Sequence, residues 1–313
     1  MNSELPYLIK RFQPDHINDM ADLYHAVYRR RIPPGFFTNK YNTAHTGIKH
    51  IGFLAYNEAG NPIAFYGVIP CFLQMGAKAV LAAQSADTMT HPKYQGKGLF
   101  TKLANLTFNL CKENGIRVIF GFPNQNSLPG FINKLGWQVT DTMDCFVIPV
   151  NRFDWEKLIK RLPVLNRLYA AYISHILKKH IIAQPGLNNS ALREGYDGVY
   201  RTDDYLKYKT YNNTKVIKAN RALVWLKVSN GLIIGDISLA TDNFNSVMRT
   251  VTRLARKIGV KQVLFHACPG TRMHQLFNER YWSVKSFPVI FKDLGSRLPI
   301  NRIKFTSADI DTF

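Results

Sequence analysis

Cysteine is scarce in this chain. It has four cysteines among 313 residues, at Cys71, Cys111, Cys145 and Cys268. No two of them form a C-x-x-C pair, so the sequence indicates neither a zinc site nor a disulfide framework, and we expect no bound metal. This usage is typical of a reducing compartment and predicts a cytoplasmic protein.

Long hydrophobic runs are also missing. The longest nearly apolar stretch, residues 63–73, is well short of the roughly 18 residues that a membrane-spanning helix needs. The N-terminal residues have no charged region followed by an apolar one, which a secretory signal would show. We therefore expect neither secretion nor a transmembrane anchor.

Acidic residues are few. The chain has 21 Asp and Glu against 41 Lys and Arg, a formal net charge of +20. Because an unpaired ammonium is costly to bury, most of this surplus must lie on the surface, where it predicts an anionic partner. Charge alone leaves open a nucleic acid, a phosphorylated cofactor, an anionic membrane and an acidic glycan. The hydrophobic content of 46% indicates a globular protein, and the length predicts about two domains.

The first 150 residues predict the element order β-α-β-β-β-α-β-α-β. A short strand and a helix are followed by three strands that turn-forming clusters separate, which favours antiparallel pairing. A helix with one apolar face comes next, and Gly115 is well placed to end it. We expect strands over 7–12, 51–56, 63–73, 79–90, 116–122 and 137–150, and helices from 14 to 28, from 99 to 111 and from 128 to 135.

The second half repeats part of this pattern. Phe100 and Gly115 mark the two ends of a predicted helix that leads into a strand. Phe244 and Gly259 mark the ends of a similar helix, and each lies at the same distance along the chain from its counterpart in the first half. Asp236 begins a segment similar to the one that begins at Asp87. A chance similarity between two helix–Gly–strand units would produce the same pattern, so both explanations stay open.

Residues 151–190 differ from both halves. They predict a basic amphipathic helical connector that ends in a loop over 184–189. A connector packed across two domains explains this pattern, and so does a face that rests on an anionic membrane. The cations of this segment are Lys157, Lys160, Arg161, Arg167, Lys178 and Lys179.

The strongest local signal is the loop over residues 91–100. Gly96 and Gly98 allow the backbone to approach a ligand closely, and the amides of residues 96–100 lie at the start of a helix, which suits an anion such as a pyrophosphate. The third glycine of a dinucleotide-binding loop is missing. A helix-capping turn without a ligand is the alternative.

Two blocks carry a family resemblance. One is Tyr94-Gln95-Gly96-Lys97-Gly98, and the other runs from Asn124 through Ser127 and Phe131 to Gly136-Trp137. Both resemble the GNAT superfamily of acyl-CoA-dependent N-acyltransferases, over residues 5–150. The segments around Asp87 and Phe122 look like bacterial members associated with surface-polysaccharide biosynthesis.

The resemblance implies an α/β (α+β) fold with tandem GNAT-like domains, each a mixed, mostly antiparallel sheet flanked by helices. We expect an acetyl-CoA-binding domain over 1–150, the connector over 151–190 and a second domain with the C-terminal tail over 191–313. The second domain is similar but degenerate, because Leu239-Ala240-Thr241-Asp242 stand where the glycine loop would be.

The resemblance also implies site residues. Acetyl-CoA is the expected co-substrate, and the residues expected to bind it are Met89, Thr90, Gln95, Gly96, Lys97, Gly98, Leu99, Phe100, Asn124, Asn126, Ser127 and Phe131. Many members carry a tyrosine in the region of Phe131 that protonates the departing thiolate. Its absence leaves water or another residue, such as Tyr66, as the proton donor.

Two residues are candidates for catalysis. Asp87 is the only carboxylate on the strand before the loop and is a candidate base. A structural aspartate is the alternative, and the similar Asp236 in a copy without the loop favours it. The C-terminal tail, which ends in Phe313, is acidic in a basic protein. A frayed terminus is the default expectation. The alternative hypothesis folds the tail back to the acceptor, with Phe313 as its anchor.

The function expected from these features is acetyl transfer to a primary amine, with an amino sugar of a surface polysaccharide or its precursor as the acceptor. The enzyme would be cytoplasmic and peripheral at the inner membrane face, with no nucleic-acid partner. One alternative is a tRNA-dependent aminoacyl transferase of the Fem type, which does not need an intact pyrophosphate loop. Another is a non-catalytic acyl-CoA-binding protein.

Overall fold

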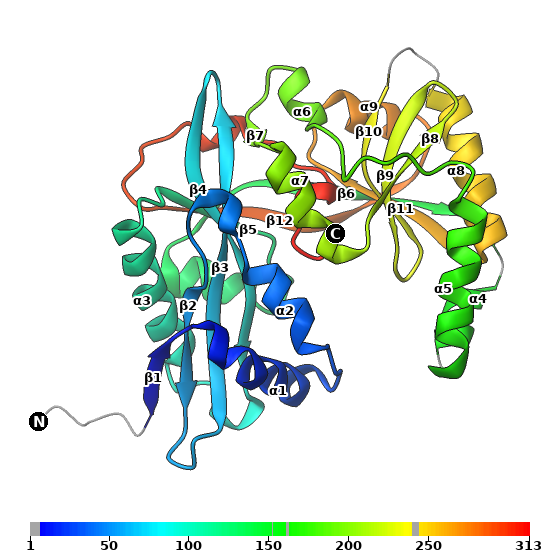
Figure 1. Ribbon diagram of the computed structural model, residues 1–313. Coiled ribbons are helices and arrows are strands. Elements are labelled where there is room, and N and C mark those ends of the chain that lie inside the picture. The colour runs from blue at the N-terminus through cyan, green and yellow to red at the C-terminus, as the bar shows by residue number, and fades with distance from the viewer. Residues whose placement is uncertain (1–6, 152, 161–162, 240–243) are drawn as a thin grey trace, which may run out of the picture. The chain divides into compact units, whose positions relative to one another are not determined.

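The computed structural model describes residues 7–151, 153–160, 163–239 and 244–313 (Figure 1). The chain forms two compact units. The first comprises Met1–Leu73, Lys78–Thr140 and Pro288–Ile300, and the second comprises Gln74–Ala77, Asp141–Phe287 and Asn301–Phe313. The expected domains were contiguous stretches of sequence, whereas each unit contains a segment from the other half of the chain.

The first unit is a mixed sheet with helices on both faces. Its strand order is β1-β2-β3-β4-β5-β12, with β1, β2 and β3 antiparallel and β4 parallel to β5. Figure 1 shows α3 on one side of the strands and α1 and α2 on the other. The elements are β1 (Leu8–Arg11), α1 (Ile17–Tyr28), α2 (Pro34–Tyr41), β2 (Ile51–Tyr56), β3 (Pro62–Met75), β4 (Lys78–Thr90), α3 (Leu99–Glu113), β5 (Val118–Gly121) and a π-helix over Gly130–Lys134.

The helix α3 packs as its sequence predicts. Leu99, Leu103 and Cys111 lie on its buried face, in one hydrophobic core with residues of the sheet. The helix ends before Gly115, which has a φ of 76°, a value that glycine adopts without strain. One helix was not among those expected: α2 begins at Pro34, in the first turn of a helix, where the missing N–H of proline costs nothing.

The second unit has a related sheet, in the order β6-β11-β10-β9-β8. The strand pair β10–β11 is parallel, and the other pairs are antiparallel. Its elements are β6 (Gln138–Pro149), α4 (Trp155–Lys160), α5 (Pro163–Leu177), α6 (Ser190–Arg193), β7 (Gly198–Val199), α7 (Asp203–Lys209), β8 (Lys215–Ala219), β9 (Ala222–Val228), β10 (Leu232–Ser238), α8 (Phe244–Ile258), β11 (Gln262–Ala267) and α9 (Arg272–Asn278). The strand β12 (Ser283–Asp293) begins in this unit, and its residues from Pro288 onward belong to the first.

The internal repeat appears in the order of the elements. A parallel strand pair joined by a helix occurs as β4-α3-β5 and again as β10-α8-β11, and Gly259 follows α8 with a φ of 85° as Gly115 follows α3. The strand that follows each copy is exchanged: β12 pairs with β5, and β6 pairs with β11. Hydrophobic pattern alone cannot show such an exchange, because both strands carry the same pattern. Within the second copy, Ala240, Thr241 and Asp242 lie outside the described residues, as does Arg161 of the connector.

Among the described residues, no helix is both long enough and apolar enough to cross a membrane. All four cysteines are buried.

Candidate active site

The strands β4 and β5 pair over only part of their length. Their parallel register joins Ala82–Gln84 to Val118–Phe120, and β5 ends at Gly121 while β4 continues to Thr90. The end of β4 therefore extends beyond the partner strand. Backbone groups at such an edge can pair with an extended ligand.

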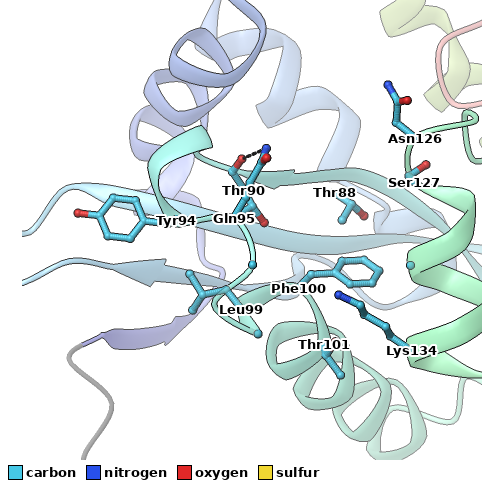
Figure 2. Close-up of a pocket in the computed structure, with 13 residues that line it drawn as sticks. Thr88, Thr90, Tyr94, Gln95, Leu99, Phe100, Thr101, Asn126, Ser127 and Lys134 are labelled. Carbon is cyan, nitrogen blue, oxygen red and sulfur yellow. Dashed lines mark hydrogen bonds between the residues drawn. The ribbon is translucent and has the colours of Figure 1, made fainter.

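A cavity of about 340 Å³ lies at this edge (Figure 2). It is formed by the end of β4, the glycine loop, the first turn of α3 and the segment that leads into the π-helix. The residues that line it are Thr88, Thr90, Tyr94, Gln95, Gly96, Gly98, Leu99, Phe100, Thr101, Asn126, Ser127, Gly130 and Lys134.

The two loop glycines adopt the left-handed backbone conformation. The φ angle is 77° at Gly96 and 76° at Gly98, and Gly98 is the N-cap of α3. The amide of Lys102 donates to the carbonyl of Gly98 at 3.0 Å, so the amides of residues 99–101 precede the first intrahelical bond. No side chain caps this end. These amides and the positive end of the helix dipole form a site for an anion.

Short-range hydrogen bonds hold the loop in shape. Nδ1 of His91 accepts from the amide of Lys93 at 3.2 Å. Nε2 of Gln95 donates to the carbonyl of Thr90 at 3.4 Å, the dashed line in Figure 2. Gln95 thus ties the loop to the end of β4.

The opposite wall depends on Asn124. Its Oδ1 accepts from the amides of Asn126 and Ser127, each at 3.0 Å, which turns the chain into the π-helix. Gly130 packs against Phe100: a Cβ on this glycine would lie 3.2 Å from the ring. A side chain here would therefore displace part of the cavity wall.

The cavity brings together eight of the residues expected to bind the cofactor, namely Thr90, Gln95, Gly96, Gly98, Leu99, Phe100, Asn126 and Ser127. Four others do not line it. Met89 is buried, Asn124 shapes the wall from behind, and Nζ of Lys97 lies 5.1 Å from the centre of the Tyr94 ring. Phe131 is buried, with its ring 5.0 Å from that of Trp137.

Five lining residues were not predicted: Thr88, Tyr94, Thr101, Gly130 and Lys134. Tyr94 lies two residues before Gly96, and Thr101 lies three residues after Gly98, in the first turn of α3. Thr88 shares the strand face of Thr90, so the alternation of β4 contained that signal. Lys134 is exposed and comes from the π-helix, and no sequence motif marked it.

Asp87 lies on β4 but does not line the cavity. It has a φ of 50°, an uncommon value for a residue other than glycine, inside the strand. Its Oδ2 lies 2.7 Å from Nζ of Lys40 and accepts a hydrogen bond of 3.0 Å from the Tyr41 hydroxyl. Both partners belong to α2, the helix that sequence analysis missed.

Tyr66 is completely buried, and its hydroxyl accepts from Oγ of Ser85 at 3.2 Å. Burial raises its pKa well above the ordinary value. Its ring lies among those of Phe100, Phe108 and Phe131. These contacts make it a core residue of the first unit.

The expectation of a frayed C-terminus is wrong. Phe313 is 2% exposed, its ring lies 5.3 Å from that of Trp225, and a Cβ on Gly235 would overlap it. Asp309 is buried as well, with Oδ1 2.8 Å from a guanidinium nitrogen of Arg201. The tail thus belongs to the core of the second unit. Nothing in this geometry brings Phe313 to the cavity, and its catalytic role stays a hypothesis.

No group of three or more His, Cys, Asp or Glu side chains could hold a metal ion within the part of the chain that the structure describes. The cavity is lined by backbone of the glycine loop, by hydroxyl, amide and ammonium side chains, and by the apolar Leu99 and Phe100.

Comparison with known proteins agrees with this geometry. Residues 8–140 match the family model for the acetyltransferase (GNAT) domain. No curated protein matches the chain.

Solved structures share the fold over most of the chain. A GCN5-related N-acetyltransferase from Kribbella flavida is 11% identical with a TM-score of 0.57, covering 92% of this chain and 72% of the other. One from Anabaena variabilis is 12% identical with a TM-score of 0.56, covering 92% and 73%. An acetyltransferase candidate from Pyrococcus horikoshii is 10% identical with a TM-score of 0.56, covering 99% and 97%. The domain match thus covers part of the first unit, and the solved structures show that the chain shares their fold.

Proposed function

We propose that this protein is an acyl-CoA-dependent N-acyltransferase that uses acetyl-CoA. One observation carries the proposal: the uncapped N-terminus of α3, with left-handed Gly96 and Gly98, opens into the cavity beside the end of β4. A turn that only began a helix would need neither this cavity nor the open strand edge.

The residues present fit the donor. The pyrophosphate would accept hydrogen bonds from the amides that begin α3, and Lys134 would add a positive charge. The pantetheine amides would pair with the backbone of β4 between Thr88 and Thr90, as an added strand does. The adenine and acyl ends have no comparably specific partners among the lining residues.

The reaction needs few protein groups. A neutral amine attacks the thioester carbon, the new C–N bond forms and the C–S bond breaks. CoA departs as a thiolate, and the nitrogen passes its second proton to that thiolate, directly or through water, which leaves a neutral amide and the CoA thiol. The acceptor ammonium must first lose a proton, and the developing oxyanion needs a donor. We propose that a backbone N–H of β4 near Thr88 donates to that oxygen, and that Asp87 is a positioning residue that holds this part of the strand through Lys40 and Tyr41.

We propose a primary amine on an amino sugar of a surface polysaccharide, or on its precursor, as the acceptor. A cavity of about 580 Å³ in the second unit, lined by both polar and apolar groups, supports a carbohydrate ligand there. Its lining includes the amide side chain of Asn188, the guanidinium of Arg193 and the ring of Tyr200, which is 40% exposed. Aromatic faces beside amide and charged groups suit a polyhydroxylated ring. The repeat of β4-α3-β5 in β10-α8-β11 supports a degenerate GNAT-like origin of this unit.

The glycine loop and the anion site at the start of α3 are both present. They argue against a Fem-type transferase, which does not need a pyrophosphate loop. The four cysteines are few, scattered and buried, which supports a reducing, cytoplasmic setting.

Two measurements on the full-length protein test the proposal. Calorimetric titration with acetyl-CoA should give saturable binding, with CoA a competitor. Release of CoA should then be assayed with a panel of amines that includes free and nucleotide-linked amino sugars. Binding without turnover on any amine would favour the non-catalytic alternative, and absence of acetyl-CoA binding would overturn the proposal.

A further inference from the structure

The helices α4 and α5 present apolar side chains on two different faces. One face packs inward: Tyr169 and Leu177 are buried in the hydrophobic core of the second unit, with Ile173 and Ile176 against it. A helix on a protein surface needs only one such stripe to pack. The other face therefore requires its own explanation.

That outward face is defined here as the α4–α5 apolar face. Its side chains are between 36% and 68% exposed, and they are Phe153, Trp155, Leu158, Leu165, Leu168 and Tyr172. Four of them, Trp155, Leu165, Leu168 and Tyr172, line a groove of about 460 Å³ together with the end of α8. Exposed apolar surface that is contiguous and grooved marks an interaction site in soluble proteins.

The face is held firmly by the rest of its unit. Glu156 is 1% exposed and accepts from the amides of Asn230 and Gly231, at 2.8 and 2.6 Å. The Tyr172 hydroxyl donates to the carbonyl of Lys257 at 2.8 Å. The amide of Trp155 donates to the carbonyl of Gly259 at 3.2 Å. These bonds fix α4 and α5 to their neighbours while the apolar side chains stay in solvent.

Exposed cations surround the face. Arg256 and Lys257 line the groove itself. Lys157 of α4, Arg167 of α5, and Lys178 and Lys179, which directly follow α5, are also exposed. Between residues 153 and 180 the only carboxylates are Asp154 and Glu156, and Glu156 is buried. Cations near exposed tryptophan, tyrosine and leucine side chains complement a surface that has negative charge on its outer layer and apolar groups below that layer.

We propose that the α4–α5 apolar face docks on an anionic lipid bilayer. Trp155, Leu165 and Leu168 enter the boundary between headgroups and acyl chains, and the surrounding cations contact lipid phosphates. A second copy of this chain is a poorer fit, because cations of one sign would face each other, whereas protein interfaces exclude charge from their centre. This role is independent of acyl transfer.

The test uses the natural fluorescence of the full-length protein. Trp155 is 53% exposed and Trp282 71%, whereas Trp137 and Trp225 are buried. In a Trp282→Phe background, Trp155 is the only exposed tryptophan. We expect vesicles with about one third phosphatidylglycerol to shift its emission to the blue, with at least tenfold tighter binding than to neutral phosphatidylcholine vesicles, and weaker binding at high salt.

Matched variants locate the interface. Leu168→Glu should weaken binding to anionic vesicles at least tenfold, whereas Val284→Glu, at another exposed apolar residue of the same unit, should not. The double variant Arg256→Glu/Lys257→Glu should weaken it more than Lys207→Glu/Arg280→Glu, which changes the net charge equally.

Three results would overturn the proposal. The first is equal binding to neutral and anionic vesicles. The second is equal behaviour of Leu168→Glu and Val284→Glu. The third is a combination of two measurements: wild type does not bind vesicles, and analytical ultracentrifugation shows a dimer that Leu168→Glu dissociates. That result would assign the face to a second copy of this chain.

Discussion

Nζ of Lys40 lies 2.7 Å from Oδ2 of Asp87, and the lysine side chain is 2% exposed. The pair joins α2 to β4 at the residue where the strand backbone turns left-handed. Such a conformation costs roughly 1–3 kcal/mol unless its surroundings enforce it. The ion pair with Lys40 holds Asp87 in this conformation. The next residue, Thr88, lines the cavity proposed to bind the acyl donor.

Replacing Asp87 separates positioning from proton transfer. Asn tolerates the left-handed conformation, so Asp87→Asn should fold, lower kcat modestly and keep the shape of the pH–rate profile. A general base would behave differently, because its loss costs roughly 10²–10⁴-fold and removes a limb of that profile. Steady-state kinetics from acid to alkaline pH decide the matter. A lost limb in Asp87→Asn would make Asp87 the base.

The glycine at the start of α3 can be tested against the glycine after its end. Gly98 and Gly115 both have a φ of 76°, and a Cβ on either meets no atom within 4 Å. Gly98→Asp should abolish acetyl-CoA binding, because its carboxylate occupies the anion site, whereas Gly98→Ala should weaken it less. Alanine at Gly115 imposes the same backbone strain away from the cavity and should leave the affinity unchanged in calorimetry. Wild-type affinity in a folded Gly98→Asp protein would exclude this site.

Lys134 and Lys97 offer a choice between two cations for the donor phosphates. Lys134 lines the cavity, whereas the ammonium of Lys97 lies over the Tyr94 ring. We expect Lys134→Gln to weaken acetyl-CoA binding several-fold and to reduce its salt dependence, since an exposed charge pair is screened. Lys97→Gln should change both less. The reverse order would indicate that Lys97 swings toward the phosphates when the donor binds.

The glycine loop was predictable because local rules govern it: glycine at positive φ, a strand before it and an amphipathic helix after it. Thr90, Gln95 and Ser127 followed from the same motifs. Lys134 and the Lys40–Asp87 pair were not predictable, since a π-helix and a contact between distant segments leave no local pattern. The exchange of β6 and β12 was hidden for the same reason.

Lys209 makes stability depend on pH. Its side chain is buried with Nζ 2.8 Å from the carbonyl of Ile310, and burial lowers its pKa to about 7 from 10.5. Between these values the unfolded chain binds a proton that the folded protein lacks, so stability rises with pH. The destabilisation caused by burying Lys209 is therefore largest below pH 7, and it decreases as the pH rises toward 10.5.

Urea unfolding of wild type and Lys209→Met measures this effect. The stability of wild type relative to the variant should rise by about 1 kcal/mol per pH unit between pH 7.5 and 9.5. Lys207→Met, at an exposed lysine of the same helix, should show no such trend relative to wild type. Parallel curves for wild type and Lys209→Met would mean that the nearby carboxylates keep Lys209 charged in the folded protein.

The buried C-terminal residue predicts a structural role for the tail. Phe313 packs on Trp225, and its carbonyl accepts from Nδ2 of Asn212 at 2.6 Å. Phe313→Ala should destabilise the second unit by about 3–5 kcal/mol, as truncation of a buried phenylalanine does, and Phe313→Leu by less. Deleting residues 309–313 also removes the Asp309 partner of the buried Arg201, so the loss should be larger. Turnover per folded molecule and acetyl-CoA affinity should stay near wild type. If the deletion instead cuts turnover at least about tenfold while the unfolding midpoint is unchanged, the tail acts on the acceptor rather than on the fold.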